Sequence, residues 1–275
     1  MPTILLLAAP SHATPTLQAP AKLDPGTAAI IHITDAIPGS SFQGWLNDTP
    51  FPITPDGAAI IALDMEVEPG VAHLRVETTS PHGERAGLVK KLSVMRRPYK
   101  EERLTLPKKK VNLNKKDLTR AVKETAWIKK TYTRRGGRVG YLEGFQMPFK
   151  GRLSGIFGSR RILNGEPRKP HGGIDLAARR GTPIRTTAPG TVAMAGRGEF
   201  FFTGNTVVVD HGDGVISLYS HMHKVRVKEG DWLPRGAIIG TVGSTGRATG
   251  PHLHWGITVR GDRVDPLRMP GMNKN

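Results

Sequence analysis

The chain contains no cysteine among its 275 residues. This absence excludes disulfide bonds, zinc sites built from cysteine, and thiol nucleophiles. Long apolar runs are missing as well, since no stretch approaches the roughly 20 apolar residues that a membrane-spanning helix needs. Acidic residues are scarce, 23 against 40 basic ones, so the formal net charge is +17. A chain with this charge is expected to meet an anionic partner such as nucleic acid, a membrane surface or an acidic polymer.

Aromatic residues make up only 6% of the chain, and none interleave with the basic stretches in the manner of a nucleic-acid-binding motif. Nucleic acid is therefore not expected as a partner. Hydrophobic residues account for 37%, which is enough for globular domains with cores. The 33 glycines and 22 prolines indicate many turns and hence a mainly β fold of one or two domains.

Residues 1–21 are expected to be a leader. Ile4 to Ala9 form a short apolar run, and Ser11-His12-Ala13 is weakly similar to a signal-peptidase site, but no Lys or Arg precedes the run. Two interpretations stay open, a signal peptide whose true start lies upstream of Met1, which we favour, and a disordered N-terminus. Residues 14–21 are rich in Thr, Pro and Ala and are expected to be flexible.

Residues 22–97 alternate short apolar stretches with turn signals, as in a small β-sandwich. The strands that we expect are 28–33, 58–63, 72–77 and 87–94. A stretch of this length is enough for a small immunoglobulin-like unit.

Residues 98–144 are expected to be a basic linker with a helix. From Lys100 to Arg138 the net charge is +10, with 14 basic residues against 4 acidic ones. Residues 115–128 have apolar side chains at helical spacing, which predicts one amphipathic helix. The helix could be a solvated linker, a contact for an anionic polymer or partner, or a segment that regulates access to a cleft.

Residues 145–275 are predicted to form a mostly β domain with a groove lined by loops. The expected strands are 191–195, 205–210, 215–220, 225–227, 237–242 and 252–257, and they predict an antiparallel set. His211-Gly212-Asp213-Gly214 is a hairpin signal between two of them. We read Asp210, His211 and Asp213 as turn residues.

Three segments of this last part hold histidine and a carboxylate: His171-Gly172-Gly173-Ile174-Asp175, Leu218-Tyr219-Ser220-His221 and Pro251-His252-Leu253-His254-Trp255. Imidazole nitrogen and carboxylate oxygen are the ligands that Zn²⁺ takes in open catalytic sites, where water fills the remaining position.

The spacing within these segments adds information. In a strand, His252 and His254 lie about 6–7 Å apart on one face, which suits one metal ligand and one neighbour of the metal-bound water. Leu253 and Trp255 then lie on the opposite, buried face. The pair Gly172-Gly173 disfavours a helix between His171 and Asp175, so a bend that glycine permits is expected there.

The three segments, in this order, resemble the HxxxD, YxH and HxH motifs of the LytM/lysostaphin-type zinc metallopeptidases, peptidase family M23. The flanking sequences are similar too, among them Phe157-Gly158-Ser159-Arg160-Arg161 and Gly243-Ser244-Thr245-Gly246. The resemblance covers roughly residues 145–268. Gly44-Trp45-Leu46-Asn47 shows a much weaker similarity to the Ig-like domains that precede the catalytic domain in some exported members.

The resemblance implies that His171, Asp175 and His254 are zinc ligands and that His221 and His252 are catalytic residues that do not bind the metal. One of these two would take or orient the proton of water, and the other would donate to the developing oxyanion; the sequence does not divide these roles. His223 departs from the family pattern and is kept as a residue that could act behind His221. Asn164 is expected to be a turn residue that could line the cleft.

The resemblance also implies an exported zinc endopeptidase, periplasmic or associated with the cell wall, that cuts peptide cross-links or stem peptides of peptidoglycan, an anionic polymer in many bacteria. The alternatives are a non-catalytic module that binds cell wall or activates other hydrolases, and an enzyme whose cleft the basic linker blocks. The bond that is cut and the oligomeric state cannot be read from the sequence.

Overall fold

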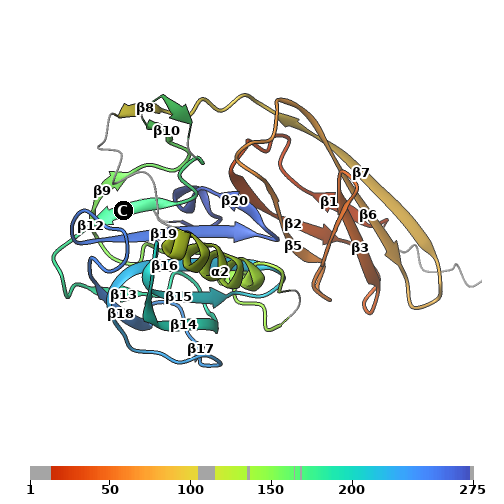
Figure 1. The fold of residues 1–275 in the computed structure, drawn as a ribbon. Coiled ribbons are helices and arrows are strands. Elements are labelled where there is room, and N and C mark those ends of the chain that lie inside the picture. The colour runs from red at the N-terminus through yellow and green to blue at the C-terminus, as the bar shows by residue number, and fades with distance from the viewer. Residues whose placement is uncertain (1–13, 105–114, 135–136, 164, 168, 273–275) are drawn as a thin grey trace, which may run out of the picture.

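The computed structural model describes residues 14–104, 115–134, 137–163, 165–167 and 169–272. Most of the leader and Asn164 lie outside these residues. The described chain is mainly strand, as expected, with a β-sandwich in its N-terminal third and a large sheet in its C-terminal half (Figure 1).

The N-terminal sandwich consists of two antiparallel sheets. One sheet contains β1 (Thr16–Gln18), β2 (Thr27–Thr34) and β5 (Ala58–Leu63), and the other contains β3 (Ser41–Leu46), β4 (Thr49–Phe51), β6 (Gly70–Thr79) and β7 (Arg85–Val94). The prediction of a flexible segment at 14–21 is wrong in part, because β1 pairs with the edge of β2 from Thr16 to Gln18. An immunoglobulin-like topology stays a prediction.

Strand β5 is buried on both faces, which explains its unbroken apolar sequence. Its residues Ala59, Ile61 and Leu63 belong to the core of the sandwich. Ile60 and Ala62 point the other way and belong to the main core of the C-terminal half. One strand therefore joins two hydrophobic cores.

The C-terminal sheet has ten strands, and every pair within it is antiparallel. The path runs β17 (Trp232–Leu233), β14 (Gly190–Phe200), β15 (Gly204–Asp210), β16 (Val215–Val225), β19 (His252–Val259), β12 (Ile174–Ala177) and β9 (Arg152–Gly155). Off this path lie β13 (Pro183–Arg185), β18 (Ile238–Val242) and β20 (Asp262–Val264). The strand expected at 225–227 is wrong beyond Val225, where β16 ends after an irregular pairing with β18.

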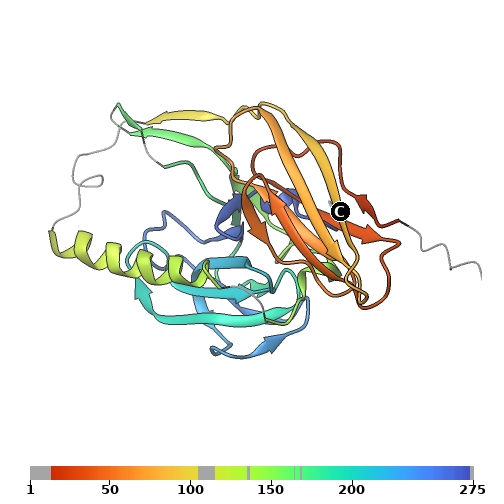
Figure 2. The same ribbon diagram turned by 90° about the vertical axis from the view of Figure 1, so that its right-hand side faces the viewer.

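The two faces of this sheet pack against different parts of the chain. On one face, Val207, Tyr219 and Trp255 are fully buried in the main core. On the other face, helix α2 (Lys115–Thr131) lies across the strands, and its Ile128 packs with Val208 and Leu218 in a separate cluster (Figures 1 and 2). The helix predicted at 115–128 is thus present and covers one face of the sheet.

The stretch expected as a linker, 98–144, contains further elements besides α2. β8 (Glu101–Leu104) pairs in parallel with β10 (Arg160–Leu163), which also pairs with β11 (Glu166–Pro167). The 3₁₀ helix η1 (Tyr141–Glu143) contributes the fully buried Tyr141 to the main core. A second 3₁₀ helix, η2 (Pro266–Arg268), follows β20.

Ion pairs connect the sandwich to the C-terminal half. Arg263 of β20 donates from Nε and Nη2 to the two carboxylate oxygens of Asp64, at 3.0 and 2.6 Å, and from Nη2 to Glu66 at 2.6 Å. Arg97 pairs with Asp265 in the same region. Burial alone would raise the pKa of Asp64, but the hydrogen bonds from Arg263 outweigh it and hold the pKa below its usual value. Such a fork-to-carboxylate pair is stronger than a single contact.

We expect Asp64→Asn to lower the free energy of unfolding by about 1–3 kcal/mol near neutral pH, because a partly buried guanidinium loses its charged partner. Glu77→Gln is the matched control, since its pair with Arg75 is about half exposed on both sides, at 48% and 49%, and such pairs stabilise little. Because the folded-state pKa of Asp64 is depressed, its contribution is present above the unfolded pKa near 3.8 and is lost as the pH falls further. Urea unfolding at pH 7 and pH 3 measures both effects. Equal losses of unfolding free energy in Asp64→Asn and Glu77→Gln would contradict the stabilising role of the pair between Arg263 and Asp64.

Candidate metal centre

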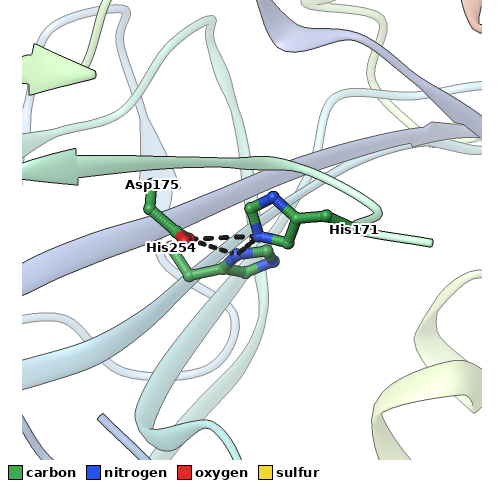
Figure 3. A group of neighbouring side chains, drawn as sticks. All are labelled: His171, Asp175 and His254. Atoms are coloured by element: carbon green, nitrogen blue, oxygen red, sulfur yellow. Dashed lines mark hydrogen bonds and ion pairs between the residues drawn. The ribbon is translucent and has the colours of Figure 1, made fainter. Parts of the chain in front are cut away.

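Strand pairing brings the first and third motifs together. In the register of β12 with β19, Asp175 lies opposite His254, and Ala177 lies opposite His252. His171 lies just before β12 and reaches the same point from the side (Figure 3). Leu253 and Trp255 are fully buried on the other face of β19, as the alternation predicts.

The chain bends at Gly173, between His171 and Asp175. The prediction of a bend is confirmed, but the reason is space rather than backbone angle, since neither glycine in Gly172-Gly173 has a positive φ. A Cβ atom on Gly173 would lie 2.4 Å from the carbonyl oxygen of Trp255. Only glycine therefore lets this loop approach β19 closely enough to place His171.

Three possible ligand atoms converge. His254 Nδ1 lies 2.9 Å from Asp175 Oδ1 and 3.0 Å from His171 Nε2, and His171 Nε2 lies 3.2 Å from Asp175 Oδ1 (Figure 3). Metal–ligand bonds of 2.0–2.1 Å in a tetrahedron place ligand atoms about 3.3 Å apart. The cluster is therefore close to the spacing that a zinc ion requires, and the two imidazoles and one carboxylate fit that ion.

Neighbouring groups orient this cluster. Ile156 O lies 3.0 Å from His171 Nδ1 and can only accept, so Nδ1 holds the hydrogen and Nε2 is left with its lone pair toward the cluster. A Cβ on Gly155 would lie 2.2 Å from Asp175 Oδ2, so glycine at this position of β9 makes room for the carboxylate.

Burial sets the charge states of the cluster. Burial alone would raise the pKa of Asp175, but its contacts with the imidazoles of His171 and His254 outweigh burial and lower the pKa well below its usual range. The pKa of His254 is lowered, mainly by burial, although its hydrogen bond to Asp175 opposes the shift. Near neutral pH the cluster thus offers an ionised carboxylate beside a neutral imidazole, which is the state that a metal ion needs.

His221 and His252 lie next to this cluster without joining it. Their ring centres are 4.6 Å apart, and the ring of His221 is 6.4 Å from that of His254. Each has its Nδ1 2.8 Å from a carbonyl oxygen, that of Thr245 for His221 and that of Gly250 for His252. Nδ1 therefore holds a hydrogen in both, and Nε2 is the ring nitrogen that is left without this backbone contact.

His221 has two unusual features. Its φ is +62°, a left-handed conformation that is uncommon for a residue other than glycine and that turns its side chain out of the regular alternation of β16. Burial lowers its pKa to about 4, with the hydrogen bond to Thr245 opposing. The imidazole of His221 is therefore neutral near pH 7.

The remaining sequence-predicted residues lie apart from the three ligand atoms. Arg180 Nη2 lies 3.1 Å from His223 Nδ1, so the ring of His223 contacts a residue of the loop after β12. Asp210 accepts from Arg134, and Tyr141 donates to Asp213. Asp210 and Asp213 thus have structural partners.

His211 is fully buried beneath the sheet, behind its turn. Its Nδ1–H donates to Pro189 O at 2.7 Å, and its Nε2 lies 2.7 Å from Ser217 Oγ. Both nitrogens are satisfied within the protein, which supports the sequence-based decision to leave His211 out of the site.

Two residues beside the site were missed by sequence reasoning. Tyr132, just after α2, and Arg263 of β20 line the same small cavity as His254. Tyr132 is far from the motifs in the sequence, and Arg263 follows them without belonging to one. Only the packing of α2 and the pairing of β20 reveal both positions.

Comparison with known proteins gives matches that include the segment holding this cluster. The family model for peptidase family M23 matches residues 169–266. A candidate M23 peptidase from Pseudomonas aeruginosa, known from its crystal structure, aligns with a TM-score of 0.67 and 30% identity over 91% of this chain and 96% of that one.

Two curated relatives are similar over the C-terminal part. Peptidoglycan DD-endopeptidase ShyA of Vibrio cholerae is 41% identical over 120 residues, which is 43% of this chain and 27% of that protein. DD-carboxypeptidase/endopeptidase Mpg of Neisseria meningitidis is 41% identical over 116 residues, 42% of this chain and 26% of that protein. The matched segment is thus only about a quarter of the length of these relatives.

The buried state of His211 leads to a pH prediction for the metal-free protein. Burial lowers its folded-state pKa to about 4, against 6.5 for an unperturbed histidine. Between these two pKa values His211 binds a proton in the unfolded chain but not in the folded chain. The free energy of unfolding therefore falls as the pH drops from about 6.5 to about 4, and His211 accounts for up to roughly 3 kcal/mol of this fall. Urea unfolding at several pH values should show a shallower decline in His211→Asn.

Exposed His73 supplies the control, because His73→Asn should leave the slope of stability against pH unchanged. A slope in His211→Asn equal to that of the parent protein would contradict the assignment.

Proposed function

The chain belongs to peptidase family M23, and on that premise we propose that it is a zinc-dependent endopeptidase that hydrolyses peptide cross-links or stem peptides of bacterial peptidoglycan. The observation that supports the metal is the cluster of His171, Asp175 and His254, whose ligand atoms all lie within 4.8 Å of one another. The names of the curated relatives, a peptidoglycan DD-endopeptidase and a DD-carboxypeptidase/endopeptidase, support the substrate.

The donor set defines what the metal would contribute. Two imidazoles and one carboxylate would hold a zinc ion with room for water, and the ion would lower the pKa of that water toward neutrality and polarise a carbonyl. His171, Asp175 and His254 would hold the zinc ion. Asp175 supplies the negative charge, and the Ile156 carbonyl fixes the ring of His171.

Proton transfer is assigned to His221 and His252. With Nδ1–H donated to a backbone carbonyl in each ring, Nε2 is the atom that exchanges protons with reactants. One of the two accepts a proton from the attacking water at its Nε2, and the other, with a proton on Nε2, donates a hydrogen bond to the oxyanion of the substrate carbonyl. The lowered pKa of His221 keeps its Nε2 unprotonated before reaction at neutral pH.

The non-catalytic alternative, a module that binds cell wall or activates other hydrolases, predicts that some of these groups are lost or separated. Here the three candidate ligands converge, and both additional histidines lie beside them. We therefore favour the enzyme.

We propose that the protein acts outside the cytoplasm, in the periplasm or at the cell wall, because its substrate lies there. The described residues contain no helix with the length and apolar character needed to cross a membrane.

The first test separates the metal ligands from the proton-transfer residues. Asp175→Ala and His254→Ala should weaken zinc affinity by well over about 100-fold, since even residues that only orient ligands contribute 10- to 100-fold. His221→Ala and His252→Ala should keep zinc affinity within a few fold and lose the release of muropeptides from purified sacculi. His73→Ala is the control for both readouts.

Zinc titration by calorimetry and mass spectrometry of the released fragments measure the two effects in the same preparations. If the zinc-loaded parent protein releases no fragments, and His254→Ala behaves as the parent does, the proposal fails.

A second test concerns the basic surface. If the net charge of +17 holds the protein on an anionic polymer, retention on isolated cell walls should fall as salt is raised from about 0.05 to 0.5 M, because exposed charges are screened. Replacing the exposed residues Lys116, Lys123 and Lys130 of α2 by Gln should weaken retention at low salt and flatten its salt dependence. Retention that does not change with salt would contradict an electrostatic contact.

A further inference from the structure

Strand β16 has an irregularity at His221. On one edge, its pairing with β15 advances from Tyr219 to Met222 on β16 while it advances only from Val207 to Asn205 on β15. β16 therefore carries one extra residue here, which makes a β-bulge, and His221 lies in this bulge with its φ of +62°. On the other edge, β16 changes its partner at the same place, from β19 before the bulge to β18 after it.

A residue in the left-handed conformation is costly unless neighbouring groups fix it. The backbone of His221 is fixed by the turn between β14 and β15, because His221 N donates to Thr203 O at 2.8 Å. Its ring is fixed by a different segment, the loop 243–251 between β18 and β19, since Nδ1–H donates to Thr245 O at 2.8 Å. The direction of the ring thus depends on where this loop places the carbonyl of Thr245.

The side chain of Thr245 fastens the loop to two strands. Its Oγ1 accepts a hydrogen bond from Asn205 N of β15 at 2.9 Å and donates one to Met222 O of β16 at 2.8 Å. Asn205 Nδ2 also donates to Met222 O, at 3.2 Å. Because Met222 directly follows His221, the hydroxyl of Thr245 holds the backbone beside the bulge while its carbonyl holds the ring. One hydroxyl therefore connects the loop, β15 and the bulge of β16.

Two glycines make this contact possible. Gly204 and Gly246 both have a positive φ, of 61° and 70°. A Cβ atom on Gly204 would lie 2.3 Å from Thr245 Oγ1 and 2.5 Å from Thr245 O, and a Cβ atom on Gly246 would lie 2.4 Å from Gly204 N. A side chain at either position would push the loop away from the hairpin of β14 and β15. The two atoms of Thr245 that hold the bulge and the ring can therefore approach only where glycine is present.

We propose that Thr245 is a positioning residue for His221: its hydroxyl fixes the loop, and its carbonyl then holds the ring of His221 with the hydrogen on Nδ1 and with Nε2 left for the reactants. The inference rests on the proposed function, in which His221 acts through Nε2. It gives a role in the reaction to a side chain that acts only through another residue. Loss of the hydroxyl should release the ring and slow the chemical step without changing the binding of substrate or zinc.

Thr245→Val removes the hydroxyl at nearly constant shape, so Asn205 N and Met222 O lose the group that connects them. We expect kcat for soluble cross-linked muropeptides to fall about 10- to 100-fold, the cost of a misplaced reacting group, while KM and zinc affinity stay within about twofold of the parent values. Thr245→Ser keeps the hydroxyl and should have the kcat of the parent protein.

Thr54→Val is the matched control. Thr54 Oγ1 has the same two kinds of partner, since it accepts from Ala58 N at 3.0 Å and donates to Ala58 O at 2.8 Å, but it lies in the N-terminal sandwich. Its loss should lower the melting temperature, as the loss of the Thr245 hydroxyl does, and should leave kcat unchanged. Equal values of kcat in Thr245→Val and Thr54→Val overturn the proposal.

The position of the hydrogen on the His221 ring gives a test that needs no activity. Long-range proton–nitrogen NMR spectra distinguish the two tautomers of a neutral imidazole, and the signals of His221 are identified by their loss in His221→Gln. The zinc-loaded parent and Thr245→Ser should show the hydrogen on Nδ1, and Thr245→Val should show both tautomers. A Thr245→Val ring that is unchanged from the parent overturns the proposal. A parent ring with its hydrogen on Nε2 also overturns it, whether or not Thr245→Val folds.

The outcomes separate the two proposals. A parent protein that binds zinc and cuts muropeptides, with the kcat or the His221 tautomer unchanged in Thr245→Val, overturns the role of Thr245 alone. A parent protein that binds no zinc and cuts no muropeptide overturns the proposed function. In that case the spectra, recorded without zinc, still decide whether Thr245 holds the ring, and equal spectra of parent and Thr245→Val reject it.

Discussion

A buried carboxylate between two imidazoles is the interaction on which the site depends. Removing Asp175 from water is costly, and its contacts with the imidazoles of His171 and His254 compensate so fully that its pKa ends below its usual range. The three side chains come from β19, from β12 and from the loop before β12, so no local segment could assemble them. The pairing of β12 with β19 places Asp175 beside His254, and the approach of the loop to β19 requires glycine at position 173.

The same strands explain why the site lies in a sheet face that is only partly covered. Odd positions of β16, such as Tyr219, fill the main core, whereas the even positions Ile216 and Leu218 face α2. The helix covers the apolar part of this face but leaves the row at His254 open. The alternation of side chains along the strands therefore explains both features of this face: α2 packs on its apolar part, and the part at the metal cluster stays open.

The sequence predicted the local pattern of the candidate site better than its tertiary surroundings. Strand alternation placed His252 and His254 on one face and Leu253 and Trp255 on the other, because a period of two is a local property. The helix at 115–131 was visible in its apolar spacing, but its location on the site-bearing face was not, because that depends on tertiary packing with Val208 and Leu218. The role of Gly173 was predicted for the wrong reason, since its contact with Trp255 links two distant segments. The pairing of β1 was missed because an edge strand of three residues leaves almost no pattern.

Strand β5 has a consequence for how such proteins can be recombined. Because Ile61 faces the core of the sandwich and Ile60 faces the main core of the C-terminal half, the boundary between the two halves runs through a single strand rather than along a surface. The backbone carbonyl of Ile60 also accepts from Arg260, which extends this shared boundary to polar groups. Exchanging the N-terminal half for that of a relative would therefore also replace Ile60 and Ala62 in the main core, and a functional chimera requires a donor strand that matches both sides.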